Sequence, residues 1–124
     1  STSSRQYPRF TCSQQNDRFT VDDEITGNGD LSYPIGLVTT DEVVLAGGYN
    51  TSNSGYYLYT GNTYWTMSPN YFAGAAYVRY VISDGRADYG NNVYSSSGVR
   101  PTLNLIPDSL KVGSGTADDP FMIG

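Results

Sequence analysis

The sequence predicts a small α+β domain in which short strands joined by turns outnumber helices. Tyr and Gly are abundant, with 12 and 14 residues, and charged residues make up only 15%. This composition suits β structure and adaptable surfaces better than a helical bundle. Residues 76–83 read AYVRYVIS, an alternating pattern typical of a strand. One clear helix signal, at residues 39–48, completes the mixed class.

The chain of 124 residues has the length of one domain, so residues 1–124 are assigned to a single unit. Residues 1–9 are polar and expected to be loose. Residues 10–21 have room for two short strands around a polar turn. Cys12 is the only cysteine; we expect it to pack as a small hydrophobe, and a reactive or intermolecular thiol is the alternative. The chain begins without Met or a signal-like stretch, which suggests a mature fragment or a soluble piece of a longer protein, with any anchor upstream.

The helix is expected to start at Thr39. Glu42 stands three residues later, which gives a capping box, and Val43 begins an apolar run that Gly47 and Gly48 end. Before it, residues 31–38 resemble an edge strand interrupted by Pro34.

After the helix, residues 56–59 are predicted to be a strand or a short connector. Residues 64–67 are expected to be a strand closed by Ser68-Pro69, with Trp65 as a core anchor. Residues 99–105 resemble another strand, and residues 119–123 are expected to pair at the end of the sheet.

The strand at residues 76–83 can be divided into two faces. Val78, Tyr80 and Ile82 form the more apolar set, so the sequence favours this set pointing inward. Tyr77 and Arg79 would then point outward. Asp84-Gly85 is expected to turn the chain at a hairpin tip.

Several chemistries are disfavoured by composition. The formal net charge is −5, Lys111 is the only lysine and the arginines are scattered, so the basic stripe of a nucleic-acid binder is missing. Without His, and with one Cys, the usual zinc, haem and triad chemistries lose their main residues. The acidic residues 22–24 lack the spacing of a calcium loop. Asp84 and Asp88 could act as acid and base only in a pocket that separates their carboxyl pKa values, and a hairpin tip is not expected to form such a pocket. We therefore predict no enzyme activity and no cofactor. We also predict no membrane insertion by this segment, because the sequence lacks an apolar run of about 18 residues.

The order of the short motifs resembles bacterial surface modules of the formylglycine-generating-enzyme branch of the C-type-lectin-type fold. The motifs are Tyr64-Trp65-Thr66-Met67-Ser68-Pro69, Asp84-Gly85, Gly98-Val99-Arg100-Pro101, the segments 33–37, 41–42 and 46–48, and the tail segments 113–116 and 119–121. The resemblance implies a small twisted antiparallel sheet, one or two short helices and long irregular loops. It implies structural roles for Trp65, Gly98 and Arg100, with Arg100 paired to an acidic side chain or to carbonyls. The cysteine pair of formylglycine generation and the calcium-binding strings of true lectins are absent, so the resemblance carries neither chemistry.

The same fold includes the variable proteins of diversity-generating retroelements. Their mutagenesis yields Asn, Tyr, Ser, Asp and Gly near the C-terminus, and residues 79–97 are dense in such types. An ordinary polar loop is the alternative interpretation, because one sequence cannot display variation.

Our prediction is a recognition domain of receptor or adhesin type, calcium-independent, exposed on a cell or virion surface, whose ligand is a protein or another surface ligand. A structural pilus or envelope subunit and a carbohydrate-binding module are the alternatives. The predicted binding residues are polar or aromatic and lie on the outward strand face or in the following loop: Tyr77, Arg79, Arg86, Asp88, Tyr89, Asn91, Asn92, Tyr94 and Ser96.

Overall fold

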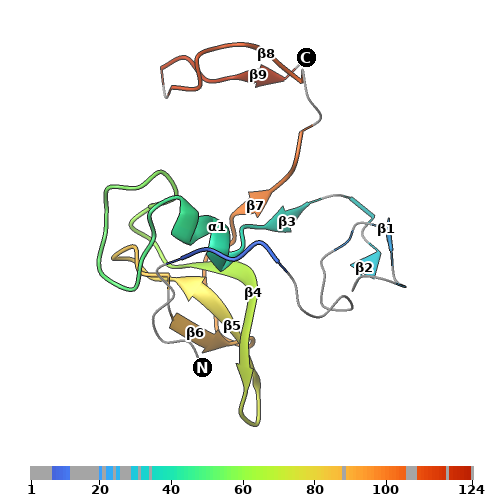
Figure 1. The fold of residues 1–124 in the computed structure, drawn as a ribbon, viewed down its shortest axis with the longest axis vertical. Coiled ribbons are helices and arrows are strands. Elements are labelled where there is room, and N and C mark those ends of the chain that lie inside the picture. Colours follow the sequence, from blue (N-terminus) through green and yellow to red (C-terminus); the bar gives the residue numbers. More distant parts are fainter. Residues whose placement is uncertain are drawn as a thin grey trace.

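The computed structural model describes residues 7–11, 20, 22–23, 25, 29–30, 32–33, 35–87, 89–105, 109–116 and 118–123. Within these residues the fold is mostly β with one short helix (Figure 1). The elements are β1 (Asp22–Asp23), β2 (Gly29–Asp30), β3 (Gly36–Leu37), α1 (Thr40–Leu45), β4 (Tyr64–Phe72), β5 (Ala76–Val81), β6 (Tyr89–Asn92), β7 (Pro101–Thr102), β8 (Leu110–Val112) and β9 (Met122–Ile123). The expected combination of short strands with a short helix is confirmed.

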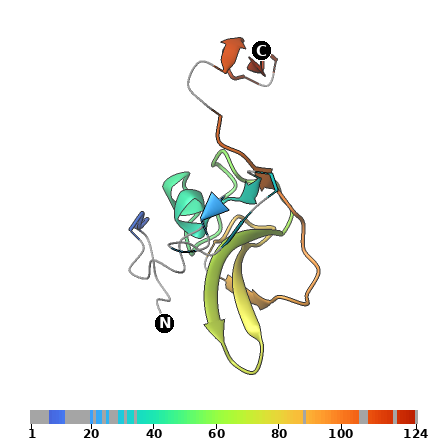
Figure 2. The same ribbon diagram turned by 90° about the vertical axis from the view of Figure 1, so that its right-hand side faces the viewer.

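The strands form small antiparallel sheets. The largest has the order β4-β5-β6, and β3 pairs with β7, β1 with β2, and β8 with β9. The tail strand β9 was expected at the end of the main sheet, but it pairs with β8 in a separate hairpin that stands away from the body (Figure 1). At the opposite end of the molecule the curved β4–β5 hairpin projects beyond the helix (Figure 2).

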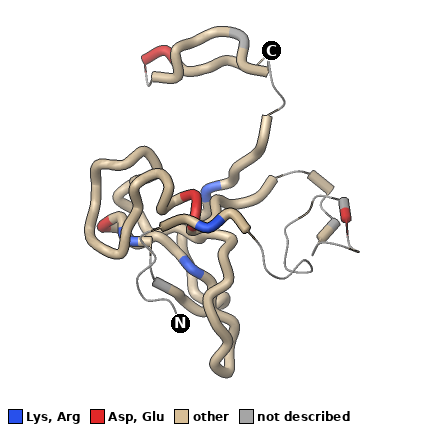
Figure 3. The backbone as a smooth tube through the Cα atoms, in the orientation of Figure 1, with Lys and Arg blue, Asp and Glu red and all other residues tan. Residues whose placement is uncertain are grey.

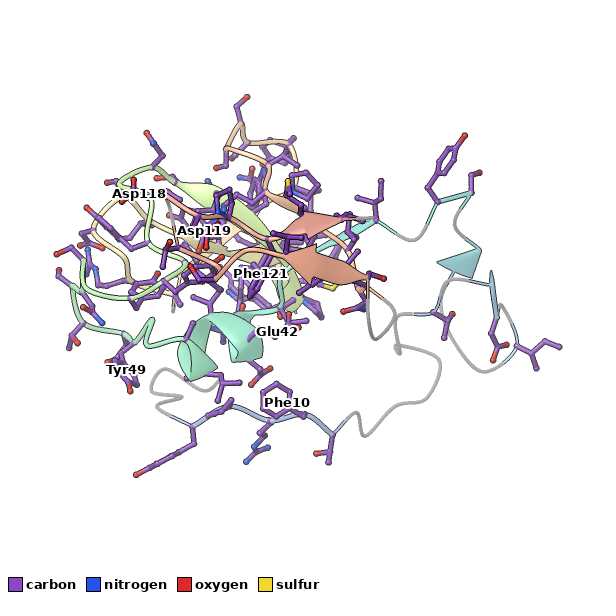
Figure 4. All side chains as sticks on the ribbon, turned by 90° about the horizontal axis from the view of Figure 1, so that it is seen from above. Phe10, Glu42, Tyr49, Asp118, Asp119 and Phe121 are labelled. Atoms are coloured by element: carbon purple, nitrogen blue, oxygen red, sulfur yellow. The ribbon has the colours of Figure 1, made fainter. Side chains whose placement is uncertain are left out.

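Helix α1 forms as the sequence predicts. The Thr39 hydroxyl accepts the N–H of Glu42 at 3.1 Å, and the Glu42 carboxylate accepts the N–H of Thr39 at 2.7 Å, so the capping box is complete. The helix ends before Gly47, whose φ of 111° is in the left-handed region. Residues 7–11 run beside this helix (Figure 4), where the N–H of Arg9 donates to Asp41 at 2.7 Å. Residues 1–6 and Cys12, for which we made predictions, lie outside the described residues.

The core lies between α1, the loop after it and the first half of the sheet. Its buried apolar residues are Val38, Val43, Tyr56, Tyr64, Val81 and Ala87. The aromatic anchor in strand β4 is therefore Tyr64, 2% exposed, and the prediction of Trp65 as core anchor is wrong. Trp65 is half-buried on the other face of β4, where its ring lies 5.8 Å from that of Tyr80.

The sequence predicted that the strand would end at Ser68-Pro69, but β4 does not end there. It continues to Phe72, with register shifts on both sides of Pro69. Pro69 is tolerated because β4 is an edge strand of its sheet, where a missing N–H need not break a ladder. The extension lengthens the hairpin and determines where the candidate site lies.

Other segments are less regular than expected. Of the two alternatives predicted for residues 56–59, the connector forms and the strand does not; in it, the N–H of Tyr59 donates to the carbonyl of Tyr56. The strand expected at residues 99–105 is reduced to Pro101–Thr102.

The predicted inward face of β5 is wrong. Val81 is 1% exposed and lies in the core opposite Tyr64, so the set Tyr77, Arg79, Val81 points to the helix side. Val78 and Tyr80, expected inside, are only partly buried. The physical reason is that α1 and its following loop cover the sheet near Val81 only, so burial depends on position along the strand as much as on face.

The turn at Asp84-Gly85 is packed against the body and is not a free hairpin tip. The N–H of Asn53 donates to Asp84 O at 3.0 Å, and the Tyr56 hydroxyl donates to Gly85 O at 2.9 Å. Gly85 has a φ of 88°, and a Cβ there would lie 1.8 Å from Asn53 O. Only glycine meets both conditions.

Candidate ligand-binding face

The helix side of the β4-β5-β6 sheet has a covered half and an uncovered half. Near α1, Tyr64 and Thr66 are each 2% exposed, and the Thr66 hydroxyl lies 3.1 Å from that of Thr40 in the helix. Farther along the hairpin, Tyr71 is 54% exposed. The helix is only six residues long, and the β4–β5 hairpin extends beyond it (Figure 2). Among the described residues, the helix therefore leaves the outer half of this face uncovered.

Three side chains form one row across the uncovered half, here called the aromatic row: Tyr71 on β4, Tyr77 on β5 and Asn92 on β6. Tyr71 pairs with Tyr77, and Tyr77 pairs with Asn92, so all three share a face. The two rings are stacked, with centroids 4.5 Å apart and planes inclined by 10°. The stack holds both rings in one orientation.

Asn92 also belongs to a small hydrogen-bonded cluster at the end of β6. The Ser95 hydroxyl lies 2.6 Å from Asn92 Oδ1 and 3.1 Å from Asn91 Oδ1, and can donate to either. The N–H of Asn92 donates to Asn91 Oδ1 at 2.9 Å. Both amide oxygens are thus engaged within the cluster, whereas the amide nitrogens make no hydrogen bond to the described residues. These nitrogens are oriented donors.

The remaining predicted residues are dispersed. Arg79 shares the face of the aromatic row but lies closer to the helix and has an interaction of its own. Tyr94 is 77% exposed in the turn after β6, and Ser96 is exposed beyond it. Asp88 and the side chain of Tyr89 lie outside the described residues.

Arg86 belongs to the packed turn and not to the aromatic row. Its side-chain Nε lies 2.8 Å from Asp84 Oδ2, and its backbone N–H donates to Asp84 Oδ1 at 3.2 Å. The Arg86 guanidinium beside Asp84 holds the pKa of that carboxyl below its ordinary value. Ser52 donates to the same carboxylate at 3.0 Å, which ties the turn to the loop after the helix.

Two of the residues predicted to be structural, Gly98 and Arg100, have contacts that fit this role. Gly98 bridges β4: its carbonyl accepts the N–H of Trp65 at 2.9 Å, and a Cβ on Gly98 would lie 2.8 Å from Thr63 O. Arg100 donates to Leu58 O at 2.6 Å and lies 5.0 Å over the ring of Tyr64.

The core tyrosines are titratable but structural. Burial raises the pKa of the Tyr56 phenol well above its ordinary value. Burial also raises the pKa of Tyr64, and the nearby Arg100 cation opposes that rise. Each hydroxyl donates to a backbone carbonyl, Tyr56 to Gly85 O and Tyr64 to Leu58 O. This arrangement keeps both phenols neutral at physiological pH.

Sequence reasoning missed Tyr71 and Phe72. Phe72 is 77% exposed at the end of β4, and it pairs with Ala76, which is followed in the next strand position by Tyr77. The signal that could have found them is Ala73-Gly74-Ala75, a compact turn between two aromatic runs. Pro69 masked it, because proline is usually taken as the end of a strand.

In the described part of the chain, no group of three His, Cys, Asp or Glu side chains is placed to hold a metal ion. Nor does any described helix have the length and apolar character that a membrane span requires.

Residues 35–107 match the family described as Domain of unknown function (DUF6273). This match covers more than half of the chain. The chain belongs to this family. The matched range includes α1, the main sheet and the aromatic row, and ends before the β8–β9 hairpin. Neither the curated proteins nor the solved structures include a significant match.

Proposed function

We propose that this chain is a non-enzymatic recognition domain that binds a protein or other cell-surface ligand, without calcium, through the end of its main sheet. The aromatic row is the observation that carries the proposal. It combines two fixed aromatic rings with an oriented amide on a face that the helix leaves uncovered. Rigid Tyr side chains give large contact area at a low entropic cost, and amides supply adaptable hydrogen bonds.

The exposed residues next to the row support the same function. Phe72, Val93 and Tyr94 are 77%, 56% and 77% exposed, and the N–H of Val93 donates to Ala76 O, which places them at one end of the sheet. Exposed apolar side chains that gather at one place are a feature of interaction sites. A surface location of the domain, on a cell or virion, is part of the proposal.

The finer fold is also part of the proposal. We infer a C-type-lectin-like arrangement because the closing Gly98-Val99-Arg100-Pro101 segment returns to the start of β4, and Arg100 then reaches across to Leu58. Such a closing segment is what the sequence resemblance implies.

Diversification by a retroelement would act on the same end of the sheet. Asn91, Asn92, Tyr94 and Ser95 are of the residue types that adenine-directed mutagenesis yields, and they lie in or next to the proposed face. An intact locus with an error-prone reverse transcriptase and a near-copy of this segment would support diversification. A locus without both would eliminate it and leave the recognition function untouched.

The test of recognition is binding of the fluorescently labelled domain to a panel of bacterial cells. Tyr77→Ala and Tyr94→Ala should each weaken binding at least about tenfold, because aromatic residues are frequent hot spots of recognition. Tyr57→Ala is the matched control: Tyr57 is 89% exposed but lies in the connector after the helix. Circular dichroism verifies the fold of each variant. No binding to any cell of the panel, or equal binding by all four proteins, contradicts the proposal.

A further inference from the structure

The outer ring of the aromatic row is held ready for a flat contact. Tyr71 lies on the edge strand β4 and stays 54% exposed although it stacks on Tyr77. Tyr77 lies behind the ring at 4.5 Å, almost parallel to it. A ligand that packs on Tyr71 therefore does not have to fix a freely rotating side chain.

Hydrogen-bonding groups near this ring are left without a partner among the described residues. Neither the Tyr71 hydroxyl nor the Tyr77 hydroxyl bonds to a described residue, and the same is true of Asn92 Nδ2. A phenol both donates and accepts, and an amide nitrogen donates. The row thus combines an aromatic surface with neutral donors and acceptors at its rim.

Among the described residues, the strand segments that carry the aromatic row contain no charged side chain other than Arg79. Residues 63–78 and 89–99 contain no Asp, Glu, Lys or Arg. Figure 3 shows the projecting hairpin without either colour of charge. Arg79, the nearest cation along β5, is engaged in an interaction of its own. The three side chains of the row carry no charge of their own, so the row fits a neutral ligand better than a charged one.

The size of the row favours a small repeating unit over a folded protein. A stable protein interface needs about 800 Å² and 20–30 residues from each partner. The row offers three side chains, and the exposed Phe72, Val93 and Tyr94 beside it bring the total to six, still far below that number. One sugar ring needs only an aromatic surface for its apolar C–H face and a few groups for its hydroxyls, and the partially positive C–H atoms complement the negative face of an aromatic ring.

We propose that the aromatic row of Tyr71, Tyr77 and Asn92 binds a neutral saccharide, with one sugar ring packed on Tyr71 and its hydroxyls bonded to Asn92 and the tyrosine hydroxyls. This proposal rests on the recognition function and specifies its ligand class. It requires no metal ion, since all the contacts come from side chains of the row.

The test is affinity electrophoresis of the whole chain through gels that contain laminarin, xylan, mannan or soluble starch, with alginate as an anionic comparison. At least one neutral polysaccharide should retard the chain, and alginate should not. Tyr71→Ala should weaken that retardation at least about tenfold, and Asn92→Ala should also weaken it. Tyr71→Trp should retain it, because the flat ring remains. Tyr57→Ala, exposed but remote from the row, should behave as wild type.

Two results would overturn the inference: no retardation by any of the four neutral polysaccharides, or equal retardation of Tyr71→Ala and Tyr57→Ala. A parallel measurement separates this failure from failure of the recognition function. The bacterial cells that bind the domain are treated either with periodate, which cleaves sugar diols, or with protease. Loss of binding after periodate alone supports a saccharide. Loss after protease alone leaves recognition intact and assigns the ligand to the protein class.

Discussion

The two halves of the main sheet use tyrosine in opposite ways. In the covered half, Tyr64 of β4 and Tyr56 of the connector packed against it are buried, and their hydroxyls are bonded to backbone carbonyls. In the uncovered half, Tyr71 and Tyr77 stack on each other and leave their hydroxyls without a partner among the described residues. The difference shows that composition alone cannot separate framework from binding surface in a tyrosine-rich chain. Hydrogen-bond engagement does separate them, because a buried phenol must find a partner and an exposed one need not.

The largest effect should come from the turn that closes the covered half. Gly85→Ala should reduce the free energy of unfolding by at least about 3 kcal/mol, because the new methyl group meets a backbone oxygen and φ stays positive. Urea unfolding followed by circular dichroism measures the loss. Gly74→Ala is the matched control in the uncovered half: its φ is 73°, but a Cβ there has nothing within 4 Å. Its free energy of unfolding should fall by only about 1 kcal/mol, the conformational cost of a positive φ for alanine. Equal losses would show that the packing at Gly85 is not what makes glycine necessary.

An intermediate effect is expected at the closing segment. Arg100→Ala removes the hydrogen bond to Leu58 O and the contact with the Tyr64 ring, and should cost about 2 kcal/mol. Thermal unfolding measures it as a lower Tm. Arg9→Ala removes the same charge from an exposed side chain and should leave Tm almost unchanged. An unchanged Tm for Arg100→Ala would remove this residue from the framework.

The smallest effects distinguish the two kinds of tyrosine directly. Tyr56→Phe deletes only a buried hydroxyl and leaves Gly85 O without its donor, at a cost of about 1–2 kcal/mol. Tyr71→Phe deletes an unengaged hydroxyl and should alter stability by less than about 0.5 kcal/mol. Both are measured by urea unfolding. Equal losses of stability in the two variants would contradict the division into framework and surface tyrosines.

The predictions of the helix and of the main strand, which rested on residues close in the sequence, were correct, and those of the inward face and the core anchor, which depended on contacts between distant residues, were wrong. The helix was predictable because Thr39 and Glu42 bond to each other within one turn of chain. The strand at residues 76–81 was predictable from its alternation, but its inward face was not. Val78 and Tyr80 are the more apolar set in the sequence, yet Val81 is buried because α1 and the packed turn cover that end of the strand. Trp65 was chosen over Tyr64 for the same reason: ring size was visible, but the covering elements were not.

The sequence by itself determined the capped helix, the main strand, the glycine at the turn, and the uncharged, Tyr/Asn-containing character of residues 63–78 and 89–99. Each follows from local geometry or from composition. The tertiary structure alone decided that β4 continues past Pro69, that Tyr71 stacks on Tyr77 beside Asn92, and that Arg86 belongs to a packed turn. These features depend on register between strands and on which half of the sheet a six-residue helix covers. Both are set by contacts between residues far apart in the chain, which no local pattern encodes.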